Sequence, residues 1–276
     1  MIYDCFTFFN ELDLLEIRLN YLYDHVDKFV LVEMNKTFTE LDKSFYFEEN
    51  KMRYEKFLDK IIHIKVTDIP ERTNDLEYFR TWQIESHQRE AIMRGLDNAK
   101  DEDIIIISDL DEIPSVESIE TFDSGIRVCA QAMMNFYLNN QNQTNSLWIQ
   151  GTRICRFSEL LNPEAIDIPY LGIYFTKPGT TQYMRYHKGD IFLHGGWHFS
   201  YLGGVDAIIT KLKSYSHTEL NIEKFNNKER IAQRIKEGRD LFDKEDVFKP
   251  IPIDDSFPEY IVQNQEKYKH LILDWE

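Results

Sequence analysis

The chain has 276 residues, of which 42% are hydrophobic and 29% charged, the composition of a globular protein long enough to bury a full core. Its formal net charge of −16 argues against binding to nucleic acid, or to an anionic membrane, across the whole surface. A negatively charged ligand would therefore need a local positive site, which a bound divalent metal ion can supply.

The start of the chain and its cysteines indicate a compartment. The first predicted strand begins at Ile2, which leaves no room for a signal peptide, and no apolar run reaches membrane-spanning length. These features predict a cytoplasmic protein with no transmembrane segment. Cys5, Cys129 and Cys155 are odd in number and lack the spacing of a metal site. Because Cys5 and Cys129 lie inside strand-like runs, we expect buried, reduced thiols.

Strand and helix patterns alternate through the first part of the chain. The predicted strands cover 2–9, 28–33, 60–66 and 103–108, and the predicted helices cover 11–24 and 75–100. This alternation predicts an α/β fold with a mostly parallel central sheet, of the Rossmann-like, nucleotide-binding kind, through about residue 115.

The fourth predicted strand is the stretch around which the chain is organised. Four consecutive isoleucines at 104–107 suit a strand that is buried on both faces, and Asp109, Asp111 and Glu112 follow it directly. Ligands of open α/β sheets bind beyond the carboxyl ends of the strands. Carboxylate oxygens there suit Mn²⁺ or Mg²⁺ gripping a diphosphate. The alternative is a solvated polar turn without chemistry.

After residue 115 the alternation stops. The predicted elements are strands at 127–138 and 148–157, loops at 139–145 and 163–184, and helices at 205–213 and 221–242. Neither a repeat nor a flexible linker is present. We therefore expect one domain over 1–276, with a nucleotide-binding half at 1–115 and an acceptor side with C-terminal helices at 116–276.

Residues 194–200 form a second candidate site. His194 and His198 flank a Gly-Gly pair and Trp197. The glycines could let the backbone approach a substrate that stacks on Trp197. The alternative is a tight bend between strands, with buried and hydrogen-bonded histidines.

Four further side chains have both a functional and a structural interpretation. Asp206 stands at the start of a predicted helix, where it caps the helix or acts as a general base. His217 follows that helix, as a metal ligand or an exposed turn residue. Glu33 ends the second strand, where it contacts a nucleotide or fixes the loop 35–39. Arg89 binds a donor phosphate or forms a salt bridge within its helix.

With these pieces in place, the chain resembles glycosyltransferase family 17 from its first strand almost to its end. The resemblance is carried in order by FFNELDLLEIRL at 8–19, VDKFVLVE at 26–33 with TF at 37–38, SDLDEIP at 108–114, GWHFS at 196–200, KLKS at 211–214, PEY at 258–260 and YKHL at 268–271. The family includes the enzyme that adds the bisecting N-acetylglucosamine to the core mannose of N-glycans.

The resemblance implies a GT-A-like fold, a UDP-sugar donor, Mn²⁺ on the Asp-x-Asp motif and inversion at the anomeric carbon. Carried over by residue, it makes Asp109 and Asp111 the donor and metal contacts, with Asp111 as the direct ligand. It makes Asp206 the base and His217, in preference to His198, the late histidine of the metal site. Because this chain shows no membrane anchor, we expect an acceptor glycan or glycolipid that is assembled in the cytoplasm.

The sequence thus predicts a metal-dependent inverting glycosyltransferase that moves a sugar, N-acetylglucosamine in the first instance, from a UDP-sugar to a glycan hydroxyl. Its expected donor contacts are Glu33, Arg89, Asp109, Asp111 and Trp197. Two alternatives remain. A haloacid-dehalogenase-type phosphatase also places Asp-x-Asp after a strand, although here the later pair Asp254-Asp255 lies in a Pro-rich tail. A nucleotide-sugar-binding module without catalysis would retain the same scaffold.

Overall fold

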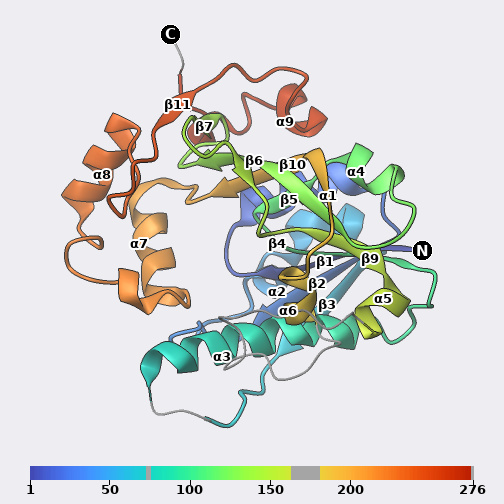
Figure 1. The fold of residues 1–276 in the computed structure, drawn as a ribbon. Coiled ribbons are helices and arrows are strands. Elements are labelled where there is room, and N and C mark those ends of the chain that lie inside the picture. The colour runs from blue at the N-terminus through green and yellow to red at the C-terminus, as the bar shows by residue number, and fades with distance from the viewer. Residues whose placement is uncertain (73–75, 163–180, 275–276) are drawn as a thin grey trace.

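The computed structural model describes residues 1–72, 76–162 and 181–274 (Figure 1). Its strands are β1 (Ile2–Phe8), β2 (Lys28–Met34), β3 (Ile61–Val66), β4 (Ile104–Asp109), β5 (Glu112–Pro114), β6 (Arg127–Asn135), β7 (Asn140–Asn142), β8 (Leu147–Trp148), β9 (Arg153–Arg156), β10 (Asp190–Ser200) and β11 (Phe248–Pro250). They join one sheet, whose main path runs β11–β7–β6–β9–β4–β1–β2–β3.

The parallel half of this sheet is built from β4, β1, β2 and β3, which pair in parallel. The isoleucine run explains the central place of β4. Ile105 and Ile107 pack into the core on one face of the sheet, and Ile106 packs into the core on the other. A strand buried on both faces has a continuous apolar sequence, as β4 does. Because β4, β1, β2 and β3 pair in parallel, the predicted α/β fold with a mostly parallel central sheet is confirmed.

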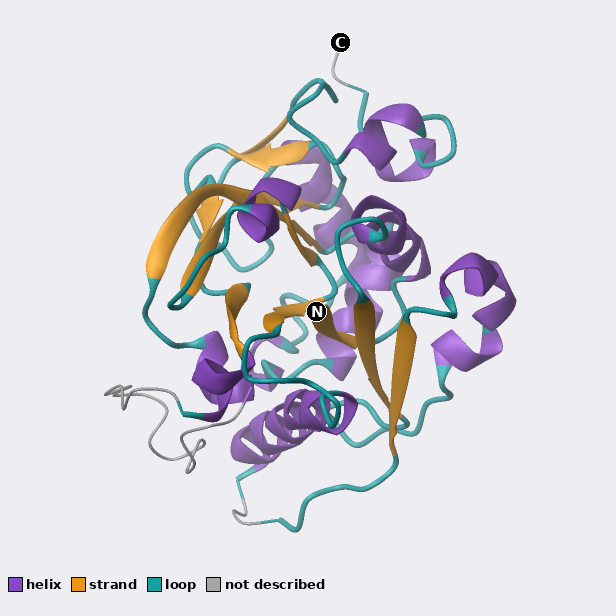
Figure 2. Ribbon diagram, turned by 90° about the vertical axis from the view of Figure 1, so that its right-hand side faces the viewer, coloured by secondary structure: helices purple, strands orange, loops and turns teal. Residues whose placement is uncertain are grey.

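Helices cover both faces of the sheet (Figure 2). The α-helices are α1 (Leu12–Leu22), α2 (Tyr46–Glu49), α3 (Glu77–Glu90), α4 (Val116–Glu120), α5 (Phe157–Leu161), α6 (Thr181–Arg185), α7 (Gly204–Ser214), α8 (Lys228–Glu237) and α9 (Glu259–Gln263), and the 3₁₀ helices are η1 (Lys51–Phe57), η2 (Ala91–Gly95), η3 (Thr218–Leu220) and η4 (Lys269–Leu271). One core lies under α1, α4 and α9, and the other under α3, η2, α5 and α6. Among the described residues, no helix is long and apolar enough to span a membrane.

The strand β10 joins the second half of the chain to the acidic turn. It pairs in parallel with β6 and antiparallel with β5. Close approach requires its two glycines: a Cβ at Gly195 would lie 2.7 Å from Cys129 Cα, and one at Gly196, whose φ is +129°, would lie 2.0 Å from the Ile113 carbonyl oxygen. The bend expected at 194–196 is therefore an irregularity within one long strand.

Several predicted boundaries were wrong. The helix expected over 221–242 is confined to α8, because the Asn227 side chain caps it by accepting from Arg230 N at 2.8 Å, and Gly238, at φ +60°, ends it. The loop expected at 139–145 contains β7. Of the loop expected at 163–184, residues 163–180 lie outside the described residues, and Thr181 opens α6.

Candidate active site

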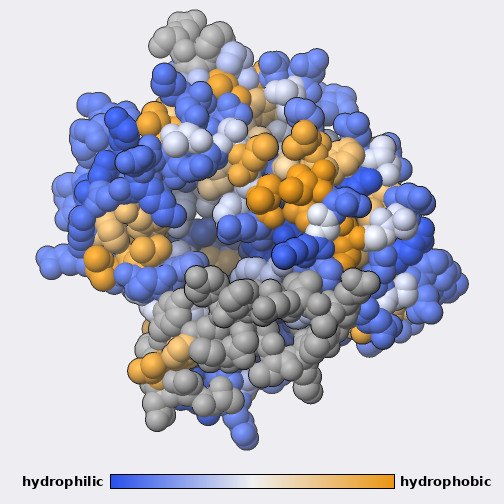
Figure 3. Space-filling model, in the orientation of Figure 1, coloured by the Kyte–Doolittle hydropathy of each residue, from blue (hydrophilic) through white to orange (hydrophobic). Residues whose placement is uncertain are grey.

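A cleft of about 420 Å³ lies at the carboxyl ends of β1, β2 and β4. One wall comes from these strand ends and from the face of α3 that carries Trp82 and Arg89; the other comes from Trp148, β10 and the end of α7. Figure 3 shows the molecule hollowed near the centre of one face, beside α7 and α8, with hydrophobic side chains gathered over β6 and β10. The cleft therefore occupies the edge of the sheet at which open α/β proteins bind ligands.

The acidic turn at the cleft floor is held by a buried arginine on α1. The Arg18 side chain is fully buried, and its Nη1 donates to the carbonyl oxygens of Asp109, Leu110 and Glu112 at 3.0, 3.1 and 3.0 Å. Its Nε and Nη2 bind the buried carboxylate of Asp4 at 2.8 and 2.6 Å. A charge-assisted bidentate pair of this kind fixes the guanidinium, and the guanidinium fixes the turn.

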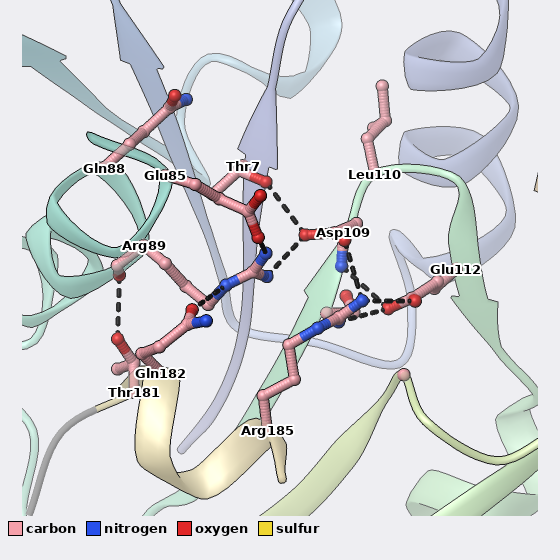
Figure 4. Close-up of polar contacts among 12 residues, drawn as sticks. Thr7, Glu85, Gln88, Arg89, Asp109, Leu110, Glu112, Thr181, Gln182 and Arg185 are labelled. Carbon is pink, nitrogen blue, oxygen red and sulfur yellow. Dashed lines mark hydrogen bonds and ion pairs between the residues drawn. The ribbon is translucent and has the colours of Figure 1, made fainter. Parts of the chain in front are cut away.

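Asp109 ends β4 and is held by two arginines (Figure 4). Its Oδ1 accepts from Arg89 Nη1 at 2.5 Å and from Thr7 Oγ1 at 3.1 Å, and its Oδ2 accepts from Arg185 Nη2 at 2.8 Å. The sequence-predicted residues Arg89 and Asp109 are thus brought together. Both carboxylate oxygens of Asp109 already have donors.

Glu112 is almost completely buried beside the cleft. Arg185 binds it through two nitrogens, each at 2.7 Å, and Trp148 Nε1 donates to it at 2.8 Å. Burial by itself raises the pKa of the Glu112 carboxyl, but the charge of Arg185 outweighs that effect and lowers the pKa to about 2. Glu112 is therefore ionised at neutral pH, and Arg185 holds it together with Asp109.

Asp111 faces the cleft from the tip of the turn. Lys211 of α7 donates to its Oδ2 at 3.0 Å, and His198 Nε2 of β10 lies 3.7 Å from its Oδ1. Burial would raise the pKa of this carboxyl, but Lys211 and His198 outweigh it and hold the pKa well below its usual range. The same ion pair raises the pKa of Lys211 against the effect of burial. Asp111 therefore presents a full negative charge to the cleft.

The residues around Asp111 could supply part of the coordination shell of a divalent metal ion. Mg²⁺ and similar ions are usually held by one or two carboxylates, with substrate phosphates and waters completing the shell. Asp111 and His198 lie close enough to supply a carboxylate and an imidazole. Within the described ranges, no three His, Cys, Asp or Glu side chains converge as a closed site. A metal here would depend on the ligand for its remaining contacts and would compete with Lys211.

Two of the predicted donor contacts do not line this cleft. Glu33 is fully buried, where it binds Lys43 Nζ at 3.1 Å and the backbone N–H groups of Tyr46 and Phe47, so it fixes the start of α2. Trp197 lies on the face of β10 opposite His198, and its Nε1 donates to the Ser256 carbonyl at 3.1 Å.

The predicted histidine and the predicted base lie further out. His217 lines the cleft, but its Nδ1 contacts Glu219 at 2.7 Å and its ring packs on Trp82. The Asp206 side chain is 83% exposed and pairs with Lys228 at 2.6 Å; it lines neither the cleft nor its neighbour. The roles of His217 in metal binding and of Asp206 in catalysis stay predictions.

The sequence reasoning missed Arg18, Arg185, Lys211 and Trp148. Arg18 had a signal, because it stands on the apolar face of its helix, three and four residues from Leu15 and Leu22, where a charge requires a buried partner. The other three come from elements far away in sequence; Lys211 lies in the family-like string at 211–214, but nothing in that string predicts its contact with Asp111.

Architecture and cleft together define a mixed α/β protein with a ligand site at the carboxyl edge of its parallel strands. The model of glycosyltransferase family 17 matches residues 1–150 and 172–274, and the chain belongs to that family. It is therefore a glycosyltransferase, and the family implies a nucleotide-sugar donor and a glycan acceptor.

Other comparisons add little. No curated protein matches the chain. Among solved structures it is similar to 2-C-methyl-D-erythritol 4-phosphate cytidylyltransferase of Francisella tularensis, with 14% identity over 70% of this chain and 89% of that one. The TM-score of 0.32 is too low to support an argument.

Proposed function

We propose that the chain transfers a sugar, N-acetylglucosamine in the first instance, from a UDP-sugar to a hydroxyl of a glycan or glycolipid, with inversion and with the help of Mn²⁺ or Mg²⁺. The observation that carries this proposal is the carboxylate of Asp111, which faces a ligand-sized cleft at the carboxyl ends of parallel strands.

The cations around the cleft support a diphosphate ligand. Arg89, Arg185, Lys43 and Lys211 all line it, in a chain whose net charge is −16. Arg89, Arg185 and Lys211 are paired with carboxylates of the same lining, so the cleft balances those acids and leaves a bound anion with cations within its reach. Lys43 is especially suited, because its side chain is only 5% exposed and its single anionic partner in the described residues, Glu33, lies behind the cleft wall.

Asp111, with His198 beside it, would hold the metal ion, while Lys211 turns to the phosphates. The ion would stabilise the charge that develops on the departing diphosphate. The roles of Asp109 are to orient Arg89 and Arg185 and, by the sequence argument, to contact the donor. In the transfer itself, the acceptor oxygen attacks the anomeric carbon from the face opposite the diphosphate.

A panel of UDP-, GDP- and dTDP-sugars, with and without Mn²⁺, tests the proposal by thermal shift and by release of the nucleoside diphosphate. We expect UDP-sugars with Mn²⁺ to raise the melting temperature and to be hydrolysed slowly. The variant Asp111→Asn should lose both effects, whereas Asp123→Asn, an exposed aspartate remote from the cleft, should retain them.

The same panel, extended by p-nitrophenyl phosphate, separates the alternatives. Turnover of p-nitrophenyl phosphate without response to any nucleotide sugar would favour the phosphatase. Binding of UDP-sugars without metal-dependent turnover would favour the non-catalytic module. Full activity of Asp111→Asn would contradict the assigned role of this carboxylate.

A further inference from the structure

A second cleft, of about 300 Å³, lies next to the first, between the start of α1 and the start of α7. The two clefts share four lining residues, which are Glu11, Asp111, Tyr201 and Lys211. The ion pair of Asp111 and Lys211 therefore stands in the wall between them. A ligand in each cleft would meet the other at this pair.

The lining of the second cleft suits a polyhydroxylated ligand with an apolar face. Its floor is formed by the buried side chains of Leu14, Phe199 and Ile208. Asn10 and Arg53 add polar groups to its lining. A largely apolar concavity with a few polar groups is typical of small-molecule sites.

Tyr201 points independently to function at the boundary. It follows β10 directly, with φ at +56°, a conformation that a bulky side chain rarely adopts. Lys211 Nζ lies 5.1 Å from the centre of its ring. Strained residues of this kind persist where the surrounding structure enforces them, and they cluster at active sites.

Glu11 is the acid at this boundary that remains available. Asp111 is paired with Lys211, and Glu112 is held by Arg185. In the described part of the chain, the Glu11 carboxylate forms no ion pair, and it accepts a hydrogen bond from Asn10 N at 3.0 Å.

Resting on the proposed function, we infer that the second cleft binds the acceptor sugar and that Glu11 is the base. The acceptor hydroxyl oxygen forms a bond to the anomeric carbon as the bond from that carbon to the diphosphate oxygen breaks. Both electrons of the broken bond leave with the nucleoside diphosphate. The hydroxyl proton passes to the Glu11 carboxylate.

Glu11 and Asp206 are the two candidates for the general base, and they differ in their position relative to the clefts. Glu11 lines both clefts, whereas Asp206 points to solvent and Lys228. A general base must come within hydrogen-bond reach of the proton that it removes. Because Glu11 lines both clefts, its carboxylate faces the boundary where an acceptor hydroxyl would meet the donor.

Two experiments test the inference. In the first, methyl β-D-mannopyranoside and methyl β-D-glucopyranoside, at concentrations high in the millimolar range, are titrated into the isotope-labelled protein with UDP and the diamagnetic ion Mg²⁺ present. We expect chemical-shift changes at residues of the second cleft, such as Leu14 and Ile208. Changes confined to other surfaces, or none at all, would overturn the acceptor site.

The second experiment measures how fast UDP-N-acetylglucosamine is hydrolysed to UDP, and how much the same glycosides accelerate the release of UDP. The variants are Glu11→Gln, Asp206→Asn and the control Glu117→Gln, an exposed glutamate on α4. Loss of a general base reduces the rate about 10²- to 10⁴-fold. We expect the glycoside-dependent rate of UDP release in Glu11→Gln to fall by at least the lower end of this range. UDP should raise the melting temperature of the variant as much as that of wild type.

The outcomes separate this inference from the proposed function. If wild type neither binds nor cleaves any nucleotide sugar, the proposed function fails. If wild type cleaves the donor and Glu11→Gln is accelerated like wild type, or if the glycosides accelerate nothing, only the inference fails. A loss in Asp206→Asn with none in Glu11→Gln would return the base to Asp206.

Discussion

Replacing Arg18 by Met should both destabilise the fold and release the acidic turn. Arg18 and Asp4 are each 0% exposed, so the variant leaves a buried carboxylate without its counter-charge. Breaking such a pair costs about 3–5 kcal/mol. The turn carbonyls of Asp109, Leu110 and Glu112 also lose their shared donor, which places the expected loss near the upper limit.

That loss corresponds to a fall in melting temperature of roughly 10–20 °C, at about 2–4 °C per kcal/mol for a chain of this size. The assay is urea unfolding followed by circular dichroism, with UDP binding by calorimetry. The double variant Asp4→Leu with Arg18→Met removes both charges and should recover most of the stability. It should not recover UDP binding, because the turn still lacks its anchor.

A loss below about 1 kcal/mol in Arg18→Met would refute the buried-pair reasoning, because removing one partner of a buried pair is strongly destabilising. Wild-type UDP affinity in the double variant would refute the claim that Arg18 positions the turn.

Three further predictions follow from single contacts. Lys211→Met removes the cation that competes with a metal ion for Asp111. We expect Mn²⁺, measured by electron paramagnetic resonance, to bind more tightly, on the order of tenfold or about 1.4 kcal/mol, and UDP to bind more weakly. Unchanged Mn²⁺ affinity would show that Lys211 does not compete with the metal ion. Gly196→Ala brings a Cβ against the Ile113 carbonyl and should unfold at much lower urea than Gly125→Ala, a positive-φ glycine with open space around it; equal midpoints would disprove the close approach. Cys5, Cys129 and Cys155 are buried, and burial raises the pKa of Cys129 to about 11. A thiol reagent at neutral pH should therefore label the protein only after unfolding. Rapid labelling of the native protein would show that the thiols are accessible.

The parallel half could be predicted from sequence because its signals are local. Four isoleucines in a row require burial on both faces, and the acids after them fall at the strand end, where the cleft lies. Arg89 could be proposed as well, since it shares a helix face with Glu85 and reaches the same edge of the sheet.

The cations opposite the acids could not be predicted in this way. Lys211 lies 100 residues from its partner Asp111, and Arg185 lies 73 residues from Glu112, so only the tertiary fold unites them. Which tryptophan lies in the cleft also depends on the geometry of the strands. Trp197 and His198 alternate across β10, so the residue next to the site histidine faces the core. The ring of Trp148 from β8 packs against His198 instead, with ring centres 4.8 Å apart.

The proposed function requires a diphosphate to lie against Asp111 at the carboxyl ends of the parallel strands. A crystal structure of the protein with UDP and Mn²⁺ tests this most directly. We expect the diphosphate between Asp111, Lys211 and Lys43, with the metal ion on the Asp111 carboxylate. UDP bound elsewhere, with the Asp111–Lys211 pair still intact and no metal beside it, would contradict the account.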